Sequence, residues 1–249
     1  MKNRIYNDYL MKDRINEYEE LLRKYLENGY IFLTISESIN KLEDNKKYIF
    51  IRHDIDSDIK IARKMFEIEK KLNIKTTYYF RLTTFSKKLV EDIVSYGSEV
   101  GYHYEEIATY CKKNKVFDKK IILKNIENIK KDFINNINRL QKEYEIKFTS
   151  IASHGDFINR KINLTNDRVY DVKLKKELKL IEAYDIESML DFRTSDCMPP
   201  KFFKENPYLP IDENKHKVLL LIHTRYWGRA PLERFKLDLM RIIDNIRYR

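Results

Sequence analysis

Cysteine is almost absent from this chain of 249 residues. Cys111 and Cys197 are the only two, and they do not form a C-x-x-C pair. Two isolated cysteines support neither a disulfide framework nor a zinc ribbon. The sequence therefore argues against both classes of small, cross-linked domain.

Glycine and proline are also scarce, at five residues each. No Pro-, Gly- or Ser-rich linker and no internal repeat divides the chain. We therefore expect one domain over residues 1–249, with an N-terminal helical extension over about residues 1–45. No glycine-rich phosphate-binding loop follows the first strong strand pattern, which disfavours a dinucleotide-binding fold.

Long apolar runs are missing as well. No stretch approaches the length of a helix that crosses a bilayer, so we expect no membrane span. The first eight residues are polar and lack the apolar core of a signal peptide. These two absences lead us to expect a cytoplasmic protein.

Acidic residues are outnumbered, with 39 Asp and Glu against 49 Lys and Arg, which gives a net charge of +10. A basic chain can indicate an anionic partner such as nucleic acid, a phosphorylated sugar or an acidic glycan. Here the lysines are spread over many predicted helices, and no nucleic-acid-binding module is visible. We therefore attribute the charge to general composition and expect no nucleic-acid partner.

Strand-like and helix-like segments alternate along the chain. Apolar, β-branched and aromatic runs end at His53, Arg81, His103, Ser153 and His223. Amphipathic segments lie between them, including a long one over about Asp118–Tyr144. Residues 157–212 give weaker signals, with a short strand candidate near Lys179–Tyr184 and a loop through Ser195–Pro200. The alternation predicts an α/β fold with a largely parallel sheet, closed or nearly closed into a barrel.

The most informative segment is the buried-strand pattern Tyr48–Ile51, which runs directly into Arg52-His53-Asp54-Ile55-Asp56. Side chains alternate along a strand, so Asp54 and Asp56 share a face if the strand continues. Two neighbouring carboxylates repel each other unless a cation or a shared proton relieves them. The segment therefore predicts a metal site at the end of this strand.

Histidine supports that prediction. Four of the five histidines, all except His216, lie at or just beyond the end of a predicted strand. The carboxyl ends of parallel strands gather on one rim, where α/β active sites form. Imidazole and carboxylate groups are the usual ligands of catalytic Zn²⁺, and three protein ligands leave a position open for water, whose pKa the metal lowers.

These residues resemble the NodB-type polysaccharide deacetylases (carbohydrate esterase family 4), and more closely a branch with an Arg-His-Asp-x-Asp strand. The resemblance extends over most of the chain. Its segments are Arg52–Asp56, Thr76–Arg81, Gly97–Glu105, Ser153-His154-Gly155 and Leu221–Trp227. It implies a distorted (β/α) barrel of seven strands and metal-dependent removal of an acyl group from an amino sugar or a related ester.

Position by position, the resemblance also implies roles. Asp54 is expected to be the general base, Asp56 and His103 metal ligands, and His223 the general acid. Three further residues are expected to support substrate binding: Arg81, Asp196 and Trp227. Trp227 has an alternative interpretation as a core residue, which is about equally common for a single aromatic.

The chain departs from the family pattern at one position. Ile107 stands where the family has a second metal-binding histidine, four residues after the first. His154 is the best substitute, because it ends the strand expected beside that of His103. Glu105 and Glu106 are weaker candidates, since glutamates are usually exposed and solvated. His53 should face away from Asp54 and act in packing or in supporting a ligand.

Two functional hypotheses follow. The first is a metal-dependent hydrolase that removes an N-acetyl group from a sugar or glycan precursor, nucleotide- or lipid-linked, before export into a capsule or surface glycan. It would use Zn²⁺, with Co²⁺, Ni²⁺ or Mn²⁺ as alternatives. The second, suggested by Ile107, is a catalytically inactive carbohydrate-binding relative.

Overall fold

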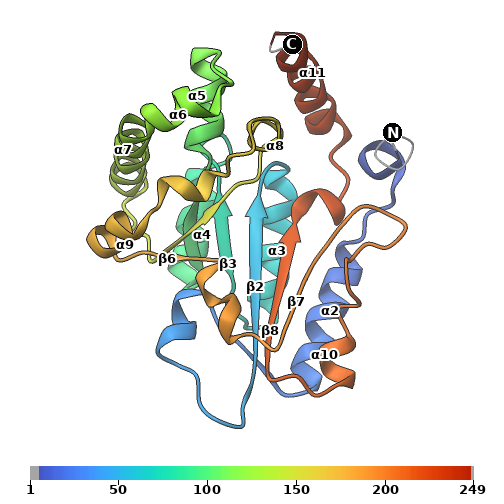
Figure 1. Ribbon diagram of the computed structural model, residues 1–249. Helices are drawn as coiled ribbons and strands as arrows, with labels where there is room; N and C mark the ends of the chain where they lie inside the picture. The colour runs from blue at the N-terminus through green and yellow to red at the C-terminus, as the bar shows by residue number, and fades with distance from the viewer. Residues whose placement is uncertain (1–5, 248–249) are drawn as a thin grey trace.

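Parallel strands form the centre of the computed structural model, which describes residues 6–247 (Figure 1). Seven strands follow one continuous path in the order β6-β5-β4-β3-β2-β8-β7. Their bounds are β2 Lys47–Ile55, β3 Thr77–Phe80, β4 Glu99–Tyr104, β5 Ser150–Ser153, β6 Ile181–Glu182, β7 Phe192–Ser195 and β8 Lys217–His223. The sheet curls into an open barrel, which confirms the predicted distorted (β/α) barrel of seven strands.

An eighth strand comes from the segment predicted as a helical extension. That segment contains the expected helix, α2 (Ile15–Glu27), but it also contains β1 (Tyr30–Phe32). β1 pairs in parallel with the first residues of β2, with Tyr30 opposite Lys47. Residues Tyr18 and Leu22 of α2 are fully buried against the sheet. The N-terminal segment is therefore integrated into the fold.

Helices cover the outer face of the curled sheet (Figure 1). Along the chain after α2, the helices are α3 Ile59–Lys71, α4 Lys87–Tyr96, α5 Glu106–Asn114, α6 Lys119–Lys124, α7 Ile126–Tyr144, α8 Phe157–Ile162, α9 Val172–Leu178, α10 Leu209–Asp212 and α11 Pro231–Arg247. Short helical turns add η1 Tyr6–Leu10, η2 Ser36–Ile39, η3 Asn166–Val169, η4 Asp185–Met189 and η5 Thr224–Tyr226. The long helix predicted over about Asp118–Tyr144 is divided at Asn125 into α6 and α7. Within residues 6–247, none of the helices has the length and apolar character that a membrane span requires.

Alternation along β2 separates the two faces of the barrel wall. Ile49 and Ile51 pack against the helices, in a cluster with Leu22 and Met65. Tyr48 and Phe50 point the other way, into an interior cluster that includes Tyr79, Ala152, Leu219 and Leu221. Continuing this alternation places Arg52 and Asp54 inside the barrel and His53 among the helices. The strand pattern thus positions the acidic residues at the inner rim.

Gly101 in β4 allows a close approach inside the barrel. A Cβ atom at this position would lie 2.5 Å from the Tyr79 ring and 2.6 Å from the Ser150 carbonyl oxygen. The Tyr79 hydroxyl in turn lies 2.6 Å from the Ser150 hydroxyl. The absence of a side chain at residue 101 therefore allows β3, β4 and β5 to pack directly below the rim.

Candidate metal centre and catalytic site

The carboxyl end of β2 lies between two other strands that contribute to the site. Asp54 is the register partner of Tyr79 on β3 and of His223 on β8. Side chains of partner residues in a parallel sheet project to the same face. Asp54 and His223 therefore both project toward the barrel interior at the rim, and Asp56 follows just beyond the strand.

Three predicted metal-ligating residues meet at this rim. The His154 Nδ1 atom lies 3.1 Å from Asp56 Oδ1 and 3.2 Å from His103 Nε2. His103 Nε2 lies 3.5 Å from the same Asp56 oxygen. One ligand atom from each of the three residues falls within a group no wider than 4.8 Å. One residue of β4 and two residues that follow β2 and β5 thus converge, as their positions at strand ends predicted.

The His103 ring is held in one orientation. Its Nδ1–H donates to the Ala152 carbonyl oxygen at 3.0 Å, which leaves the Nε2 lone pair facing Asp56 and His154. Burial lowers the pKa of His103 to about 4, although Asp54 and Asp56 act in the opposite direction. A neutral imidazole whose other nitrogen is fixed by a carbonyl group is the form that binds metal.

Two hydrogen bonds of its backbone fix the position of His154. Its N–H donates to the Tyr104 carbonyl oxygen at 2.8 Å, and its own carbonyl accepts from Asn166 Nδ2 at 2.6 Å. Ile107, in the position where the family has histidine, is fully buried in the helical core. The imidazole that joins His103 and Asp56 therefore comes from the loop after β5, as the sequence suggested.

The two glutamates considered as alternative ligands have other partners. Glu106 is buried on the helical side, where it accepts from the Tyr102 hydroxyl at 2.6 Å. Glu105 is near His154 and Asp156 but forms a bidentate ion pair with Arg81, at 2.7 Å for the shortest contact. Asp156 is paired with Lys112. The Glu105–His154–Asp156 group is thus already neutralised by cations of the chain.

The expected general base, Asp54, is fixed by an arginine on its own strand. Arg52 Nε and Nη2 donate to the two carboxylate oxygens of Asp54 at 2.8 and 2.9 Å. Both residues are almost completely buried. Burial alone would raise the pKa of Asp54, but the charge and hydrogen bonds of Arg52, together with His103 and His223, lower it. Asp54 is therefore an ionised carboxylate, 3.3 Å from His103 Nε2.

The expected general acid, His223, forms a dyad with Asp196. His223 Nδ1 lies 2.7 Å from Asp196 Oδ1, and the His223 backbone N–H donates to the other oxygen. Burial lowers the pKa of His223, but the charge and hydrogen bond of Asp196, together with the charges of Asp56 and Asp54, raise it to about 9. His223 is thus protonated at neutral pH and able to donate a proton.

Two residues predicted to contact substrate instead support His223. The Asp196 side chain has no exposed surface, and its second oxygen accepts from Trp227 Nε1 at 2.8 Å. Trp227 is 1% exposed and packs edge-on against Tyr18 and Phe203. Neither side chain presents a surface to a sugar, so their assignment as substrate contacts is wrong. The core interpretation of Trp227 describes its position.

Arg81 and His53 complete the set of predicted residues. Arg81 is partly buried and pairs with Glu105 as described above, while Asp56 contributes to the electrostatic environment of its guanidinium. Its role in substrate binding stays a prediction. His53 is fully buried outside the barrel, 2.6 Å from Glu69 and stacked on Tyr78. It faces away from Asp54, as strand alternation required.

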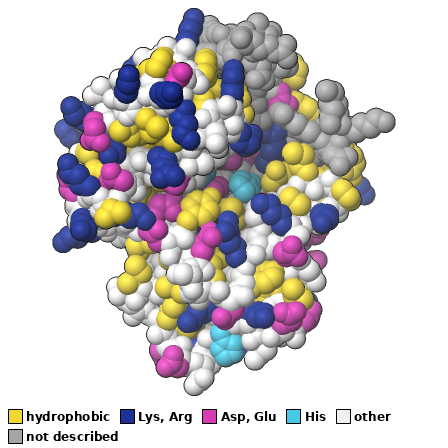
Figure 2. Space-filling model, viewed as in Figure 1, with side chains coloured by type: hydrophobic (Ala, Val, Ile, Leu, Met, Phe, Trp, Pro, Cys, Tyr) yellow, Lys and Arg dark blue, Asp and Glu magenta, His cyan; other side chains and the backbone are white. Residues whose placement is uncertain are grey.

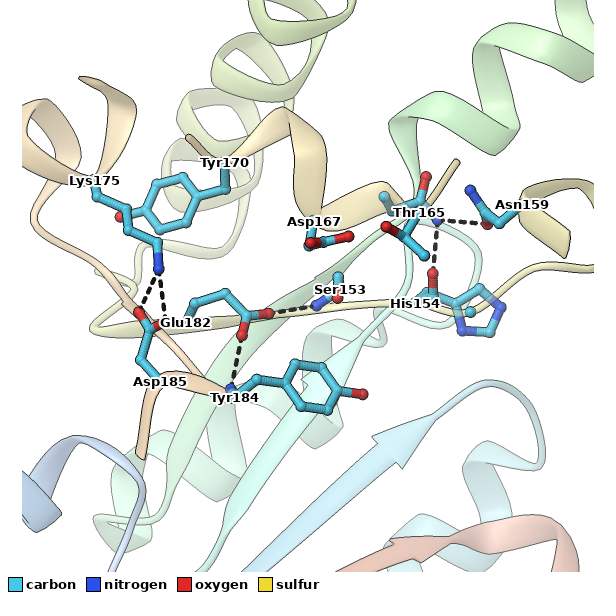
Figure 3. A pocket seen from close by; sticks show the side chains of 12 residues that line it. Ser153, His154, Asn159, Thr165, Asp167, Tyr170, Lys175, Glu182, Tyr184 and Asp185 are labelled. Carbon is cyan, nitrogen blue, oxygen red and sulfur yellow. Dashed lines mark hydrogen bonds and ion pairs between the residues drawn. The ribbon is translucent and has the colours of Figure 1, made fainter. Parts of the chain in front are cut away.

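A cavity of about 420 Å³ opens beside His154 (Figure 3). Its lining comes from the ends of β5 and β6 and from the segments around η3 and α9. Figure 2 shows the corresponding face of the molecule hollowed near its centre, with acidic side chains beside a histidine and basic side chains scattered around. The cavity gives the candidate metal centre room for a ligand on one side.

The sequence interpretation missed three residues near the centre. Arg52 could have been found, because it lies two positions before Asp54 and therefore on the same face of the strand. Glu182 is the last residue of β6, a strand of only two residues, and Tyr184 follows it; both line the cavity. Such a short strand leaves no readable alternation in the sequence.

The chain's own atoms fit a divalent cation at this centre. Asp56 Oδ1 is buried but lacks a hydrogen bond of normal geometry among the described residues. It faces two imidazole nitrogens, so the donors are one oxygen and two nitrogens. That combination is typical of Zn²⁺ and of other first-row transition metals. A metal therefore suits an arrangement that would otherwise leave a buried carboxylate oxygen unsatisfied.

Comparison with known proteins finds similarity only among solved structures. No protein-family model and no curated protein matches the sequence. A CE4 family pseudoenzyme from Bacillus anthracis aligns with 80% of this chain and 62% of its own, at 15% identity and a TM-score of 0.46. A mutant of that pseudoenzyme, described as having restored enzymatic activity, aligns at 15% identity and a TM-score of 0.45, over 80% of this chain and 65% of its own. The chain thus spans less than two thirds of the structures to which it is similar, and these belong to the family that its motifs resemble.

Proposed function

We propose that this protein is a metal-dependent hydrolase that removes an acyl group, most simply N-acetyl, from an amino sugar or glycan precursor. One observation carries the proposal. Asp56, His103 and His154 place three metal-binding atoms within 4.8 Å of one another. The ionised Asp54 and the protonated His223 lie on neighbouring strands at the same rim. A metal-ligand set flanked by a base and an acid is an arrangement suited to metal-assisted amide hydrolysis.

Asp56, His103 and His154 would hold the metal, with Zn²⁺ as the first choice and Co²⁺, Ni²⁺ or Mn²⁺ as alternatives. When bound, such an ion supplies Lewis acidity and lowers the pKa of water. The chain's contribution is to present three preorganised ligands. The Ala152 carbonyl fixes the ring of His103, and the Asn166 amide fixes the backbone of His154.

The reaction divides between the two flanking residues. Asp54 accepts a proton from the attacking water while the oxygen of that water bonds to the acyl carbon. His223 donates a proton to the sugar nitrogen as the carbon–nitrogen bond breaks, so the products are a carboxylic acid and an amine. Arg52 keeps Asp54 oriented, and Asp196 keeps His223 protonated. The two protonation states match these roles at neutral pH.

A nucleotide- or lipid-linked sugar made inside the cell remains our proposal for the substrate, together with a cytoplasmic location. Acetate release from N-acetylated sugars and their oligomers tests the hydrolase proposal directly. Zn²⁺- or Co²⁺-loaded protein should release acetate, and a His103→Ala/His154→Ala variant should not. A metal-loaded wild-type protein that releases no acetate from any of these acceptors would count against the proposal.

A catalytically inactive carbohydrate-binding protein is the second candidate. The observation in its favour is the bidentate Arg52–Asp54 pair, which lowers the pKa of Asp54 and so weakens it as a base. Metal analysis together with activity separates the two candidates. Stoichiometric metal and sugar binding without acetate release would favour the inactive protein, whereas release that depends on Asp54 and His223 would exclude it.

A further inference from the structure

Two buried arginines hold the backbone of residues 225–228, the segment that follows β8. The backbone N–H of Arg14, the residue before α2, donates to the Trp227 carbonyl oxygen at 2.7 Å, and Arg14 Nη1 donates to the Tyr226 carbonyl oxygen at 3.4 Å. Arg234 Nη2 of α11 donates to the carbonyl oxygens of the first and last residues of the segment, at 2.7 and 2.6 Å. All four carbonyl oxygens of the segment therefore accept from one of the two arginines.

The side chain of Arg14 also packs on the side chain of Trp227. The Arg14 Cζ atom lies 4.9 Å from the ring centroid of Trp227 and 3.8 Å from that of Phe202. Glu17 accepts from Arg14 Nε at 2.7 Å, which orients the guanidinium plane. Only 10% of the Arg14 side chain is exposed, and a cation that is largely removed from water binds an aromatic ring more strongly than an exposed one. Arg14 therefore holds the indole as well as its backbone.

Tyr18 contacts the same indole from the next turn of α2. Its ring meets the Trp227 ring edge-on, with the centroids 5.5 Å apart and the planes at 68°. The Tyr18 hydroxyl donates to the buried carboxylate of Glu69 in α3, and Tyr18 has no exposed surface. A shift of Tyr18 away from the indole would weaken a buried, charge-assisted hydrogen bond, which is costly.

The indole is in turn the anchor of the dyad that contains the expected general acid. Trp227 Nε1–H donates to Asp196 Oδ2 at 2.8 Å, while Asp196 Oδ1 lies 2.7 Å from His223 Nδ1. A carboxylate that is fixed at one oxygen presents the other in a fixed direction. The orientation of the His223 ring therefore depends on the position of the indole, and through it on α2.

We propose that Arg14 and Tyr18 are positioning residues for the general acid, His223. They fix the indole of Trp227, which fixes Asp196 against the His223 ring. The inference rests on the proposed function, because that function makes His223 the proton donor. A misplacement of a reacting group by about 1 Å can cost on the order of a hundredfold in rate. The N-terminal helix thus has a role in the reaction in addition to its packing against the barrel.

Trp227 offers a direct measurement, because it is the chain's only tryptophan and its indole N–H gives a single NMR signal. Arg14→Met removes the cation and its donors but keeps an unbranched stem. We expect hydrogen exchange of the indole N–H to become about tenfold faster in this variant, because the bond to Asp196 opens more often when the ring is less constrained. Wild-type exchange in Arg14→Met would overturn the inference.

The titration of His223 separates geometry from charge. Burial lowers the pKa of His223, and the contact with Asp196 chiefly holds it at about 9. Loss of the Arg14 charge by itself would favour the protonated ring and raise the pKa. A loosened Asp196 would lower it, so we expect the pKa of His223 to fall in Arg14→Met. An unchanged or raised pKa would contradict a positioning role.

Two other variants of α2 control for the stability of the helix. Arg23→Met removes an exposed arginine from an ion pair, and Tyr25→Phe removes a buried hydrogen bond to a backbone carbonyl oxygen. Tyr25→Phe should lower the midpoint of thermal unfolding, and both variants should keep the wild-type indole exchange and His223 titration. If Tyr25→Phe changed these two signals as much as Arg14→Met, the stability of the helix would explain them and the inference would be wrong.

A conservative variant covers the case in which Arg14→Met does not fold. Arg14→Lys keeps the positive charge and the stem but lacks the planar guanidinium that stacks on the rings. We expect indole exchange faster than in wild type and slower than in Arg14→Met. Because the charge is retained, faster exchange in Arg14→Lys supports positioning by the guanidinium plane. Wild-type exchange in Arg14→Lys would count against it.

Activity distinguishes this inference from the proposed function. In an assay of acetate release, Arg14→Met should lower kcat by about tenfold, within the contribution of general acid catalysis, and leave KM unchanged. The predicted changes in indole exchange and His223 titration, in a protein whose wild type releases no acetate, would retain the positioning role and reject the hydrolase. Acetate release by Arg14→Met at the wild-type rate would retain the hydrolase and reject the positioning role.

Discussion

His223 owes its protonation state chiefly to one neighbour, Asp196, with smaller contributions from Asp54 and Asp56. Burial lowers the pKa of His223, but the Asp196 carboxylate, 2.7 Å from its Nδ1 atom, raises it to about 9 together with Asp56 and Asp54. A histidine with this partner stays cationic through neutral pH and loses its proton only as the pH rises through about 9. General acid catalysis by His223 should fail over the same range.

Replacement of Asp196 by asparagine tests this dependence. The variant keeps the shape of the side chain but removes the charge, so the pKa of His223 should fall toward the ordinary value of about 6.5. Titration of the His223 ring protons by NMR measures the shift. Asp191→Asn is the matched control. Asp191 lies just before β7, and its carboxylate accepts from the backbone N–H groups of His216 and Lys217. An unchanged His223 titration in Asp196→Asn would contradict the dyad.

The second residue-scale prediction concerns the buried Arg52–Asp54 pair. Arg52→Met should destabilise the protein by about 3–5 kcal/mol, because it leaves Asp54 buried without a counter-charge. The pKa of Asp54 is lower in the folded state than in the unfolded state. The ionised group therefore stabilises the fold at pH values above the ordinary carboxylate pKa, and this contribution is lost as the pH falls through the folded-state pKa. The deficit of Arg52→Met should therefore be largest at neutral pH and shrink in acid.

Urea unfolding at several pH values measures this deficit. The double variant Arg52→Met/Asp54→Asn serves as the control, because it removes the charge that Arg52→Met leaves unpaired. It should recover much of the lost stability. A single variant as stable as wild type, or a double variant no better than the single one, would show that the pair carries little of the site's stability.

At the scale of elements, apolar and β-branched runs made most of the sheet predictable. β2 and β8 could be located because their apolar runs are long and end at His53 and His223. β1 and β7 were missed, since each is short and includes an exposed position, so that it resembles a loop in the sequence. Strand pairing with β2 and β8 stabilises them, and such tertiary contacts have no local signature.

The site residues also divide into those that a local sequence pattern predicts and those that depend on tertiary contacts. Asp54, Asp56, His103 and His154 were predictable because each lies at or just beyond the end of a strand on the sheet path. The metal-ligand role itself stays a prediction. The buried positions of Asp196 and Trp227 depend on how the segment after β7 folds back, with an isolated bridge from Asp196 to Phe203. No periodic pattern in residues 196–203 indicates that return.

The β4–β5 contact provides the element-scale prediction. Gly101→Ala would place a methyl group 2.6 Å from the Ser150 carbonyl oxygen, which belongs to the neighbouring strand. The strands must separate to relieve the clash, at a cost of about 1–3 kcal/mol. His103 follows on β4 and His154 follows β5, so we also expect weaker Zn²⁺ binding.

Thermal unfolding and Zn²⁺ titration measure both effects. Gly155→Ala is the control, because it lies next to His154 yet its added Cβ would meet nothing within 4 Å. That variant should retain both stability and Zn²⁺ affinity. Equal effects of the two substitutions would show that strand spacing does not set the geometry of the metal ligands.

At the scale of the whole molecule, the proposed metal would connect distant parts of the chain. Asp56 follows β2, His103 is on β4 and His154 follows β5, so one ion would join three strands of the curled sheet. A ligand that binds only the folded state stabilises it by about 2.7 kcal/mol when its free concentration is one hundred times Kd. Zn²⁺ should therefore raise the midpoint of thermal unfolding of metal-free protein.

This stabilisation should depend on the histidines of the centre and on no others. His154→Ala removes a ligand at the rim, whereas His216→Ala removes the histidine in the loop before β8, outside the site. We expect Zn²⁺ to shift the unfolding midpoint of His216→Ala as in wild type and to leave that of His154→Ala nearly unchanged. Because the readout is unfolding, it separates metal binding from catalysis. An equal shift in both variants would mean that Zn²⁺ binds elsewhere, and the convergence of Asp56, His103 and His154 would then need another explanation.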